Sequence, residues 1–226
     1  MKSIHNYATV LLAFGMLAGC ATRAGNGALI GGGAGGMIGG IIGHATGNTA
    51  AGAIIGAAVG GTAGAAIGHY MDKQAAELQH DLKDAKVERV GEGIKITFNS
   101  GILFDVDSDK LRPAATTNLN NLAHVLKKYE DTQVLVQGHT DNTGSNDHNL
   151  ALSQRRANSV GKSLKSEGVK TNRISESGLG ETQPVADNGS AAGRQENRRV
   201  EVAIWADEKL KKAATDGKMV AASSAD

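Results

Sequence analysis

The chain has little cysteine, proline, aromatic character or net charge, and each shortage argues against a class of protein. Of its 226 residues one is cysteine and two are proline, and aromatic residues make up 3%. A single cysteine excludes an intramolecular disulfide and a cysteine-rich metal site, and so few aromatics argue against a large aromatic core. The formal net charge of +1 falls to 0 (+1 − 1) without Lys2, so nothing electrostatic favours binding to nucleic acid.

The N-terminus has the order of features of an export signal. Lys2 gives a short basic start, and an apolar stretch follows over residues 7–18. Small residues then precede Cys20, and this order predicts a secretory signal peptide over residues 1–19. The alternative is ordinary cleavage near Ala18, which would leave Cys20 as a free thiol, an unusual group in a secreted protein.

The sequence Leu17-Ala18-Gly19-Cys20 also resembles the bacterial lipobox. That resemblance implies cleavage before Cys20, followed by acylation of its thiol and its new amine. Several acyl chains anchor a protein stably, whereas a single chain binds only marginally. Because Ala21 rather than Asp follows the cysteine, the resemblance also implies a lipid-anchored protein of the outer membrane, with its domain in the periplasm.

Glycine is concentrated in an uncharged stretch early in the chain. Seventeen of the 31 glycines lie between positions 25 and 68, and residues 24–71 contain no Lys, Arg, Asp or Glu. Glycine recurs at every fourth position from 27 to 47, and again from 52 to 68. In a helix this spacing places the glycines along one face, where another helix can approach closely.

The same stretch divides into two halves, residues 27–46 and 50–69, of 20 residues each. A helix of that length spans about 30 Å, near the hydrocarbon thickness of a bilayer. Turn-forming residues separate the halves, so we expect a membrane-associated glycine-zipper helical hairpin within residues 20–70. Two alternatives remain open. One is a flexible spacer, which would need no strict period, and the other is a hairpin that self-associates into a homo-oligomer.

The flanks of the remaining chain are polar. Residues 71–90 become charged, and Leu78, Leu82 and Ala85 share one stripe, which predicts a linker helix. Residues 206–226 are small and polar, which predicts a disordered tail. Between these flanks, residues 91–205 have the patterning of a folded domain.

Strand and helix patterns alternate through residues 91–205. Strand patterns cover 94–98, 134–138, 199–205 and a segment that starts at Ile174, and helix patterns cover 118–129 and 150–167. This order predicts an α+β fold, a βαβαββ sandwich with its helices on one face of the sheet.

Five ordered motifs in residues 91–205 resemble those of OmpA-like domains. They are Phe104-Asp105-x-x-Ser108, Gly138-His139-Thr140-Asp141-Asn142-x-Gly144, Asn149-x-x-Leu152-Ser153-x-x-Arg156-Ala157-x-x-Val160, Gly178-x-Gly180 with Pro184, and Asn188 with Gly193-Arg194-x-x-Asn197-Arg198-Arg199-Val200. The resemblance covers half of the chain and implies an OmpA-like sandwich that binds peptidoglycan without covalent chemistry. The whole arrangement resembles lipoproteins with a glycine zipper ahead of such a domain.

The family binds the diaminopimelate residue of the peptidoglycan stem peptide, which has a free amine and a carboxylate on one carbon. The resemblance implies that Asp141 meets the amine and that Arg156 meets the carboxylate. Arginine suits this role because its planar fork grips a carboxylate through two hydrogen bonds. Leu152, one helical turn before Arg156, and Asp105 match further ligand positions of the family.

Two further candidates follow Asp141. The segment with Thr143 can turn backbone N–H groups toward an anion, and Asn149 is either a helix-start residue or a ligand-orienting one. Taken singly, an Asp before Asn and Gly is more often a turn residue, and an Arg in an Arg-Arg pair is more often solvated. The combination of motifs favours a site. Arg155 is interpreted as solvated, and residues 197–199 as structural, with contact to glycan or peptide as the alternative.

No motif in the sequence indicates catalysis. His139, Asp141 and His148 could be imagined as metal ligands, but their spacing matches no zinc site and no general base accompanies them. Residues 31–36 match a dinucleotide fingerprint, as any glycine-rich stretch does by chance, and no strand precedes them. We therefore predict a protein that is not an enzyme and that uses no metal or cofactor.

The predicted function is a tether between two layers of the cell envelope. Acyl chains at Cys20 would hold the outer membrane, and Asp141 and Arg156 would hold diaminopimelate in the wall. Many weak tethers in parallel give strong avidity. The alternative function is a glycine zipper that oligomerises in a membrane or perturbs it, with the wall-binding domain as a locator. A requirement for residues 27–69 while wall binding is intact would distinguish the two.

Overall fold

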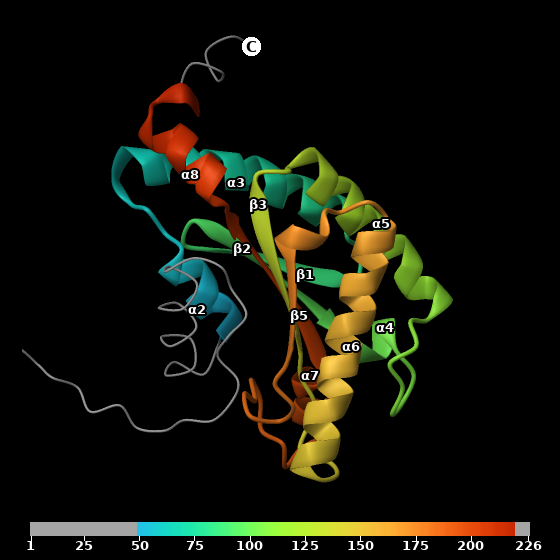
Figure 1. The fold of residues 1–226 in the computed structure, drawn as a ribbon. Coiled ribbons are helices and arrows are strands. Elements are labelled where there is room, and N and C mark those ends of the chain that lie inside the picture. Colours follow the sequence, from blue (N-terminus) through green and yellow to red (C-terminus); the bar gives the residue numbers. More distant parts are fainter. Residues whose placement is uncertain (1–48, 220–226) are drawn as a thin grey trace, which may run out of the picture.

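A computed structural model describes residues 49–219 of the chain (Figure 1). In chain order its elements are α2 (Thr49–Gly56), α3 (Gly61–Asp81), β1 (Ala85–Val90), β2 (Gly93–Asn99), α4 (Ser100–Leu103), α5 (Pro113–Lys128), β3 (Thr132–Gly138), α6 (Asn146–Ser166), the 3-10 turn η1 (Thr171–Arg173), β4 (Ile174–Gly178), α7 (Ala191–Asn197), β5 (Arg199–Ala206) and α8 (Glu208–Thr215). The strands form one sheet in the order β1-β2-β5-β3-β4. Neighbouring strands are antiparallel except β3 and β4, which are parallel.

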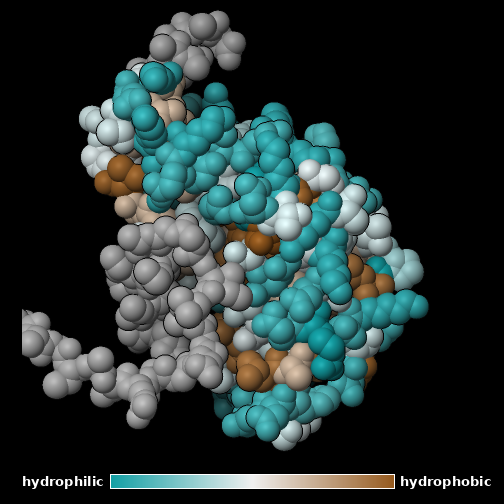
Figure 2. All heavy atoms as spheres, viewed as in Figure 1, coloured by the Kyte–Doolittle hydropathy of each residue, from teal (hydrophilic) through white to brown (hydrophobic). Residues whose placement is uncertain are grey.

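One face of the sheet carries the main core. The register aligns Val134 of β3, Ile204 of β5 and Ile94 of β2 in one row across the sheet, and all three are buried. Buried side chains of α3, α5 and α6 pack against this face. Figure 2 shows that the outward side of these helices is mostly hydrophilic, so each helix turns its apolar stripe to the sheet. This confirms the predicted α+β architecture.

Helix α6 lies unusually close to β3 and β4 because both strands end in glycine. A Cβ atom at Gly138 would lie 2.1 Å from the carbonyl oxygen of Ser153, and one at Gly178 would lie 2.3 Å from the backbone nitrogen of Gln154. No side chain fits at either position. Gly138 and Gly178 are also partners in the parallel register. The two glycines therefore set the height of α6 above the sheet.

The opposite face of the sheet is partly covered as well, by a helix from outside residues 91–205. Ala50 and Ile54 of α2 pack against Ala203 of β5, with Trp205 at the edge of the contact. A Cβ atom at Gly93 would lie 2.5 Å from a methyl carbon of Ile54. The glycine at the start of β2 thus leaves the space that the isoleucine fills.

The predicted second half of the hairpin, residues 50–69, is not one 20-residue helix. Gly60 and Gly61 have positive φ angles of 73° and 61°, which end α2 and start α3 in a new direction. The Glu92 carboxylate accepts hydrogen bonds from the backbone nitrogens of Val59 and Gly60, both at 2.7 Å. Within residues 49–219 no helix combines the length and apolar character needed to cross a membrane. The predicted first half, residues 27–46, lies outside the described residues, as does Cys20.

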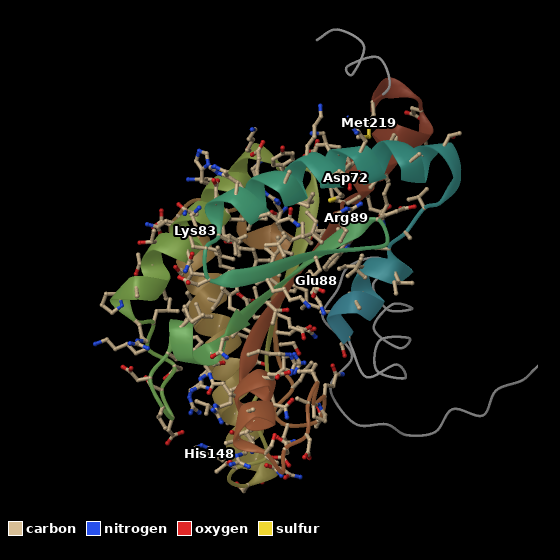
Figure 3. All side chains as sticks on the ribbon, turned by 180° about the vertical axis from the view of Figure 1, so that it is seen from behind. Asp72, Lys83, Glu88, Arg89, His148 and Met219 are labelled. Carbon is tan, nitrogen blue, oxygen red and sulfur yellow. The ribbon has the colours of Figure 1, made fainter. Side chains whose placement is uncertain are left out.

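The flanking predictions also need correction. The linker predicted over residues 71–90 is helical only to Asp81, where α3 ends, and it then forms the edge strand β1. Met71 and Leu78 of α3 are fully buried, so this segment is part of the core rather than a linker. Arg89 of β1 reaches back to Asp72 of α3 at 2.8 Å (Figure 3).

The tail predicted to be disordered over residues 206–226 contains a helix in its described part. Ala206 completes β5, and α8 follows directly. The Asp207 side chain caps α8 by accepting a hydrogen bond from the nitrogen of Leu210 at 2.8 Å. Leu210 and Ala214 are buried against the body of the protein. Two apolar residues one turn apart are enough to dock this short helix.

Candidate functional site

The candidate residues gather at one end of the sheet, where the parallel strands β3 and β4 end and α6 begins. Asp141 lies three residues beyond the end of β3. Gly144 has a φ angle of 102° and turns the chain toward α6. The Ser145 hydroxyl then caps the helix by accepting a hydrogen bond from the nitrogen of His148 at 3.3 Å. Figure 3 marks this end of the molecule with His148.

Asp141 is held as a charged group. Its side chain is 9% exposed, and one oxygen of the carboxylate forms an ion pair with Nη1 of Arg198. The other oxygen accepts a hydrogen bond from the backbone nitrogen of Thr143 at 2.9 Å. Burial alone would raise the pKa of Asp141, but the Thr143 hydrogen bonds and the Arg198 guanidinium outweigh it and hold the pKa below its usual value. The carboxylate is therefore available for a cation at neutral pH.

Arg156 is also buried, and only part of its guanidinium is engaged. Nε donates to the carbonyl oxygen of Ser108 at 2.9 Å, and Nη2 donates to that of Asp105 at 3.3 Å. The guanidinium carbon lies 5.3 Å from the centre of the Phe104 ring, a cation–π distance. Among the described residues nothing accepts a hydrogen bond from Nη1. This free donor suits an incoming carboxylate.

The charge surroundings of Arg156 place Arg198 in the same neighbourhood. Burial lowers the pKa of Arg156 below its usual value, Arg198 adds to this effect, and Asp107 and Asp109 oppose it. Arginine nevertheless stays charged. Arg198 thus interacts with both residues. It attracts the Asp141 carboxylate and repels the Arg156 guanidinium.

Asn149, Leu152 and Arg156 lie on one buried stripe of α6. Nδ2 of Asn149 donates to the carbonyl oxygen of Asp141 at 3.2 Å and to the Glu181 carboxylate at 2.5 Å. The helix starts at Ser145 instead, so the helix-start interpretation of Asn149 is wrong. Asn149 ties the Asp141 segment to the loop that follows β4.

Two predicted contributions differ in the structure. The backbone N–H of Thr143 points at the Asp141 carboxylate, and that of Asn142 donates to Oδ1 of Asn188 at 3.4 Å. Both N–H groups serve the fold of the loop and are not directed at an external anion. The carboxylate of Asp105 is 78% exposed and lies 3.6 Å from Nε of Arg112, so only its backbone carbonyl meets Arg156.

Residues 197–199 divide into two structural residues and one residue of the site. Asn197 holds the loop after β4 through hydrogen bonds with the backbone of Val185 and Ala186. Arg199 forms a buried ion pair with Glu201 at 2.7 Å. Arg198 instead turns to Asp141, which the interpretation of all three as structural missed. The signal that could have found it is strand pairing, because Val200 of β5 faces Gly138 of β3, and this brings the flanking residues together.

The three residues imagined as metal ligands do not form one group. His139 is 1% exposed, and burial together with the charges of Arg199 and Lys95 lowers its pKa far below the usual value, which keeps it neutral. Nε2 of His148 contacts the Asp107 carboxylate at 2.9 Å. Asp141 pairs with Arg198. In residues 49–219 no group of three or more His, Cys, Asp or Glu side chains is placed to hold a metal ion.

With this geometry in place, comparison with known proteins shows the family. The OmpA family profile matches residues 103–198, and a glycine zipper profile matches residues 30–75. The chain is 37% identical to the outer-membrane lipoprotein YfiB of Pseudomonas aeruginosa, over 56% of this chain and 75% of that protein. The chain belongs to the OmpA family. The two predicted resemblances, to OmpA-like domains and to glycine zippers, are therefore confirmed.

Two further relatives extend the comparison. The chain is 41% identical to the probable lipoprotein YiaD of Escherichia coli, over 61% of this chain and 64% of that protein. It therefore spans less than two thirds of the length of that relative. A solved structure, the cell wall anchor of the T6SS from Pseudomonas aeruginosa, is 32% identical with a TM-score of 0.54, over 61% of this chain and 97% of that one. The named relatives of this OmpA family member are lipoproteins and a wall anchor.

Proposed function

We propose that this OmpA family member binds peptidoglycan non-covalently and tethers the wall to the outer membrane. The ligand would be the diaminopimelate residue of the stem peptide. Asp141 would accept its ammonium group, and Arg156 its carboxylate. The tether would be completed by acyl chains on Cys20, with the domain in the periplasm. No bond is made or broken, so the protein would act as a clamp rather than as an enzyme.

The single observation that carries this proposal is the unsaturated state of Arg156. A buried guanidinium normally satisfies its donors within the protein, yet Nη1 has no partner in residues 49–219. A buried carboxylate, Asp141, lies in the same charge network through Arg198. An anion-seeking group and a cation-seeking group that share Arg198 as a neighbour suit a zwitterion. The similarity to a lipoprotein of the outer membrane and to a cell wall anchor supports the same function.

The test is co-sedimentation of the full-length protein, purified in detergent, with isolated peptidoglycan sacculi. A fragment starting near residue 87 would be unsuitable, because it cuts β1 and removes α3 from the core. The variants are Arg156→Gln and, as a matched control on the same helix, Arg155→Gln. Arg155 is half exposed, and its only ion pair in the described chain is with Asp109 at 4.0 Å.

We expect the parent and Arg155→Gln to pellet with sacculi, and Arg156→Gln to remain in the supernatant. Losing a charge-assisted bidentate contact costs about tenfold or more in affinity. Normal pelleting of Arg156→Gln would contradict the site. Failure of the parent to pellet would contradict wall binding itself. Competition by free meso-diaminopimelate, but not by cadaverine at equal concentration, would show that the ligand needs a carboxylate beside its ammonium group.

A further inference from the structure

We propose that Arg198 determines the specificity of this site for ligands that carry an ammonium and a free carboxylate side by side. The inference rests on the proposed function, because it concerns the same site. Nη1 of Arg198 contacts Oδ2 of Asp141, one of the two oxygens that a ligand ammonium would approach. The other oxygen already accepts a hydrogen bond from Thr143. A ligand must therefore compete with Arg198 for Asp141.

Arg198 is built to be displaced, unlike its neighbour Arg199. The Arg198 side chain is 35% exposed, and its second nitrogen bonds to the exposed side chain of Gln195. Arg199 is 3% exposed and fixed by Glu201 and by the carbonyl oxygens of Asn197 and Gln183. Moving Arg199 would leave a buried carboxylate unpaired, which is strongly destabilising. Arg198 can release Asp141 and stay at the edge of the site without leaving a charge buried alone, provided that a cation replaces it at Asp141.

The displaced state explains why the ligand needs a carboxylate. Once a ligand ammonium occupies Asp141, the guanidinium groups of Arg198 and Arg156 are left close together. The nearby carboxylates balance these charges only in part, because Asp107 also contacts His148 and Asp109 also lies beside Arg155. A carboxylate on the same carbon as the ammonium supplies the missing anion for both arginines. A ligand that brings only an amine would leave two like charges unbalanced, which is unfavourable.

This arrangement selects a free over an amidated carboxylate next to the amine. An amide offers a carbonyl oxygen but no negative charge, so it cannot compensate two guanidinium groups. The site would therefore bind a wall residue that has a charged ammonium group and a charged carboxylate on the same carbon. Arg156 would contribute affinity, and Arg198 would contribute the discrimination between charged and uncharged forms.

The test compares two soluble probes of nearly the same skeleton by calorimetric titration of the full-length protein in detergent. Meso-diaminopimelate carries amines and carboxylates, and cadaverine is the same chain without either carboxylate. The parent should bind meso-diaminopimelate at least about tenfold more tightly than cadaverine. In Arg198→Gln, Asp141 no longer has a competing cation, so affinity for cadaverine should rise while affinity for meso-diaminopimelate falls. The ratio between the probes should shrink several-fold.

Two further variants keep the proposal open to contradiction. Arg198→Lys retains the charge and should retain most of the preference for meso-diaminopimelate, and Lys209→Ala, in α8 beside Asp131, should leave the ratio unchanged. If Arg198→Gln weakened both probes equally, or changed neither, Arg198 would have no role in specificity. If the Gln variant did not fold, a loss of the preference in Arg198→Lys would overturn the charge argument. Failure of the parent to bind meso-diaminopimelate would instead overturn the proposed function, and this inference with it.

Discussion

Two buried arginines sit at opposite ends of the sheet, and they differ in one respect. Arg173, in η1, donates to the carbonyl oxygens of Thr132, Leu126 and Tyr129 and to the Thr132 hydroxyl, so all its nitrogens are engaged. Arg156 donates to two carbonyl oxygens and keeps Nη1 free. Burial lowers the pKa of both residues below its usual value. Burial alone therefore does not distinguish the two arginines, whereas the Nη1 group that has no protein partner does.

The strongest test of this difference between Arg173 and Arg156 is to replace each arginine in turn. Arg173→Met should lower the free energy of unfolding by about 3–5 kcal/mol, because it leaves several buried carbonyl oxygens without donors. Arg156→Met should lower it by about 1 kcal/mol yet abolish co-sedimentation with sacculi. Urea unfolding followed by the fluorescence of the single tryptophan, Trp205, measures the first quantity. Equal losses of stability in the two variants would remove the distinction between the two ends.

A second prediction concerns α2, which touches neither arginine. Ile54 is 1% exposed and Ile55 is 51% exposed. Ile54→Ala should cost about 2–3 kcal/mol of stability, and Ile55→Ala should change it by less than about 0.5 kcal/mol. Both variants should pellet with sacculi like the parent, because Asn197 holds the loop after β4 in addition to the hydrogen bonds that link Gln183 of that loop to Thr49 of α2. Equal stability of the two alanine variants would mean that α2 does not dock in solution.

A third prediction follows from the lowered pKa of Asp141. A carboxylate whose pKa is lower in the folded than in the unfolded state stabilises the fold at pH values above its unfolded-state pKa. This stabilisation is lost as the pH falls through its folded-state pKa. Sedimentation of the parent with sacculi should therefore persist as the pH falls from 7 to the usual aspartate value of 3.8 and decline only below it. In Arg198→Gln the pKa of Asp141 should rise, so the decline should begin at a higher pH. Coincident normalised profiles would contradict this role of Arg198.

The smallest effect is expected at the protein surface, at the end of the sheet where Arg173 is buried. Nζ of Lys209 pairs with the Asp131 carboxylate at 2.8 Å, but the lysine is 77% exposed. Lys209→Ala should leave the midpoint of urea unfolding nearly unchanged, since exposed ion pairs contribute little. If Lys209→Ala lost as much free energy of unfolding as Arg173→Met in the same urea titration, the surface ion pair would be as important for stability as the buried arginine, which would contradict this prediction.

Most of the sheet could be predicted from sequence, because strands that are buried on one face alternate visibly. The strands β2, β3 and β5 and the helices α5 and α6 lie within a few residues of their predicted positions. Strand β1 was missed because its residues are nearly all half-buried and its charges interrupt the alternation. Helix α8 was missed because only Leu210 and Ala214 hold it, too few for a periodic pattern.

The site was predictable only in part. Asp141, Arg156, Leu152 and Asn149 stand in motifs, and the structure gathers them at one end of the sheet. The partner of Asp141 was missed, because Arg198 lies 57 residues away and can be inferred only once the pairing of β3 with β5 is known. The four-residue spacing of the glycines, in turn, indicates a helix face that packs closely against another surface, but it does not identify that surface. Residues 49–69 find that partner in the domain itself.

The docking of α2 also fixes the reach of the proposed tether. Residues 21–48 separate Cys20 from Thr49, the first residue that the structure describes. These 28 residues can span at most about 100 Å when fully extended, at roughly 3.3–3.6 Å per residue. Undocking α2 as far as Gly60 would add 12 residues, or roughly 40 Å at the same extension. The contact between Ile54 and Gly93 would then limit the length of the tether. Beyond the full extension of residues 21–48, the wall could move farther from the membrane only if α2 detached from the sheet.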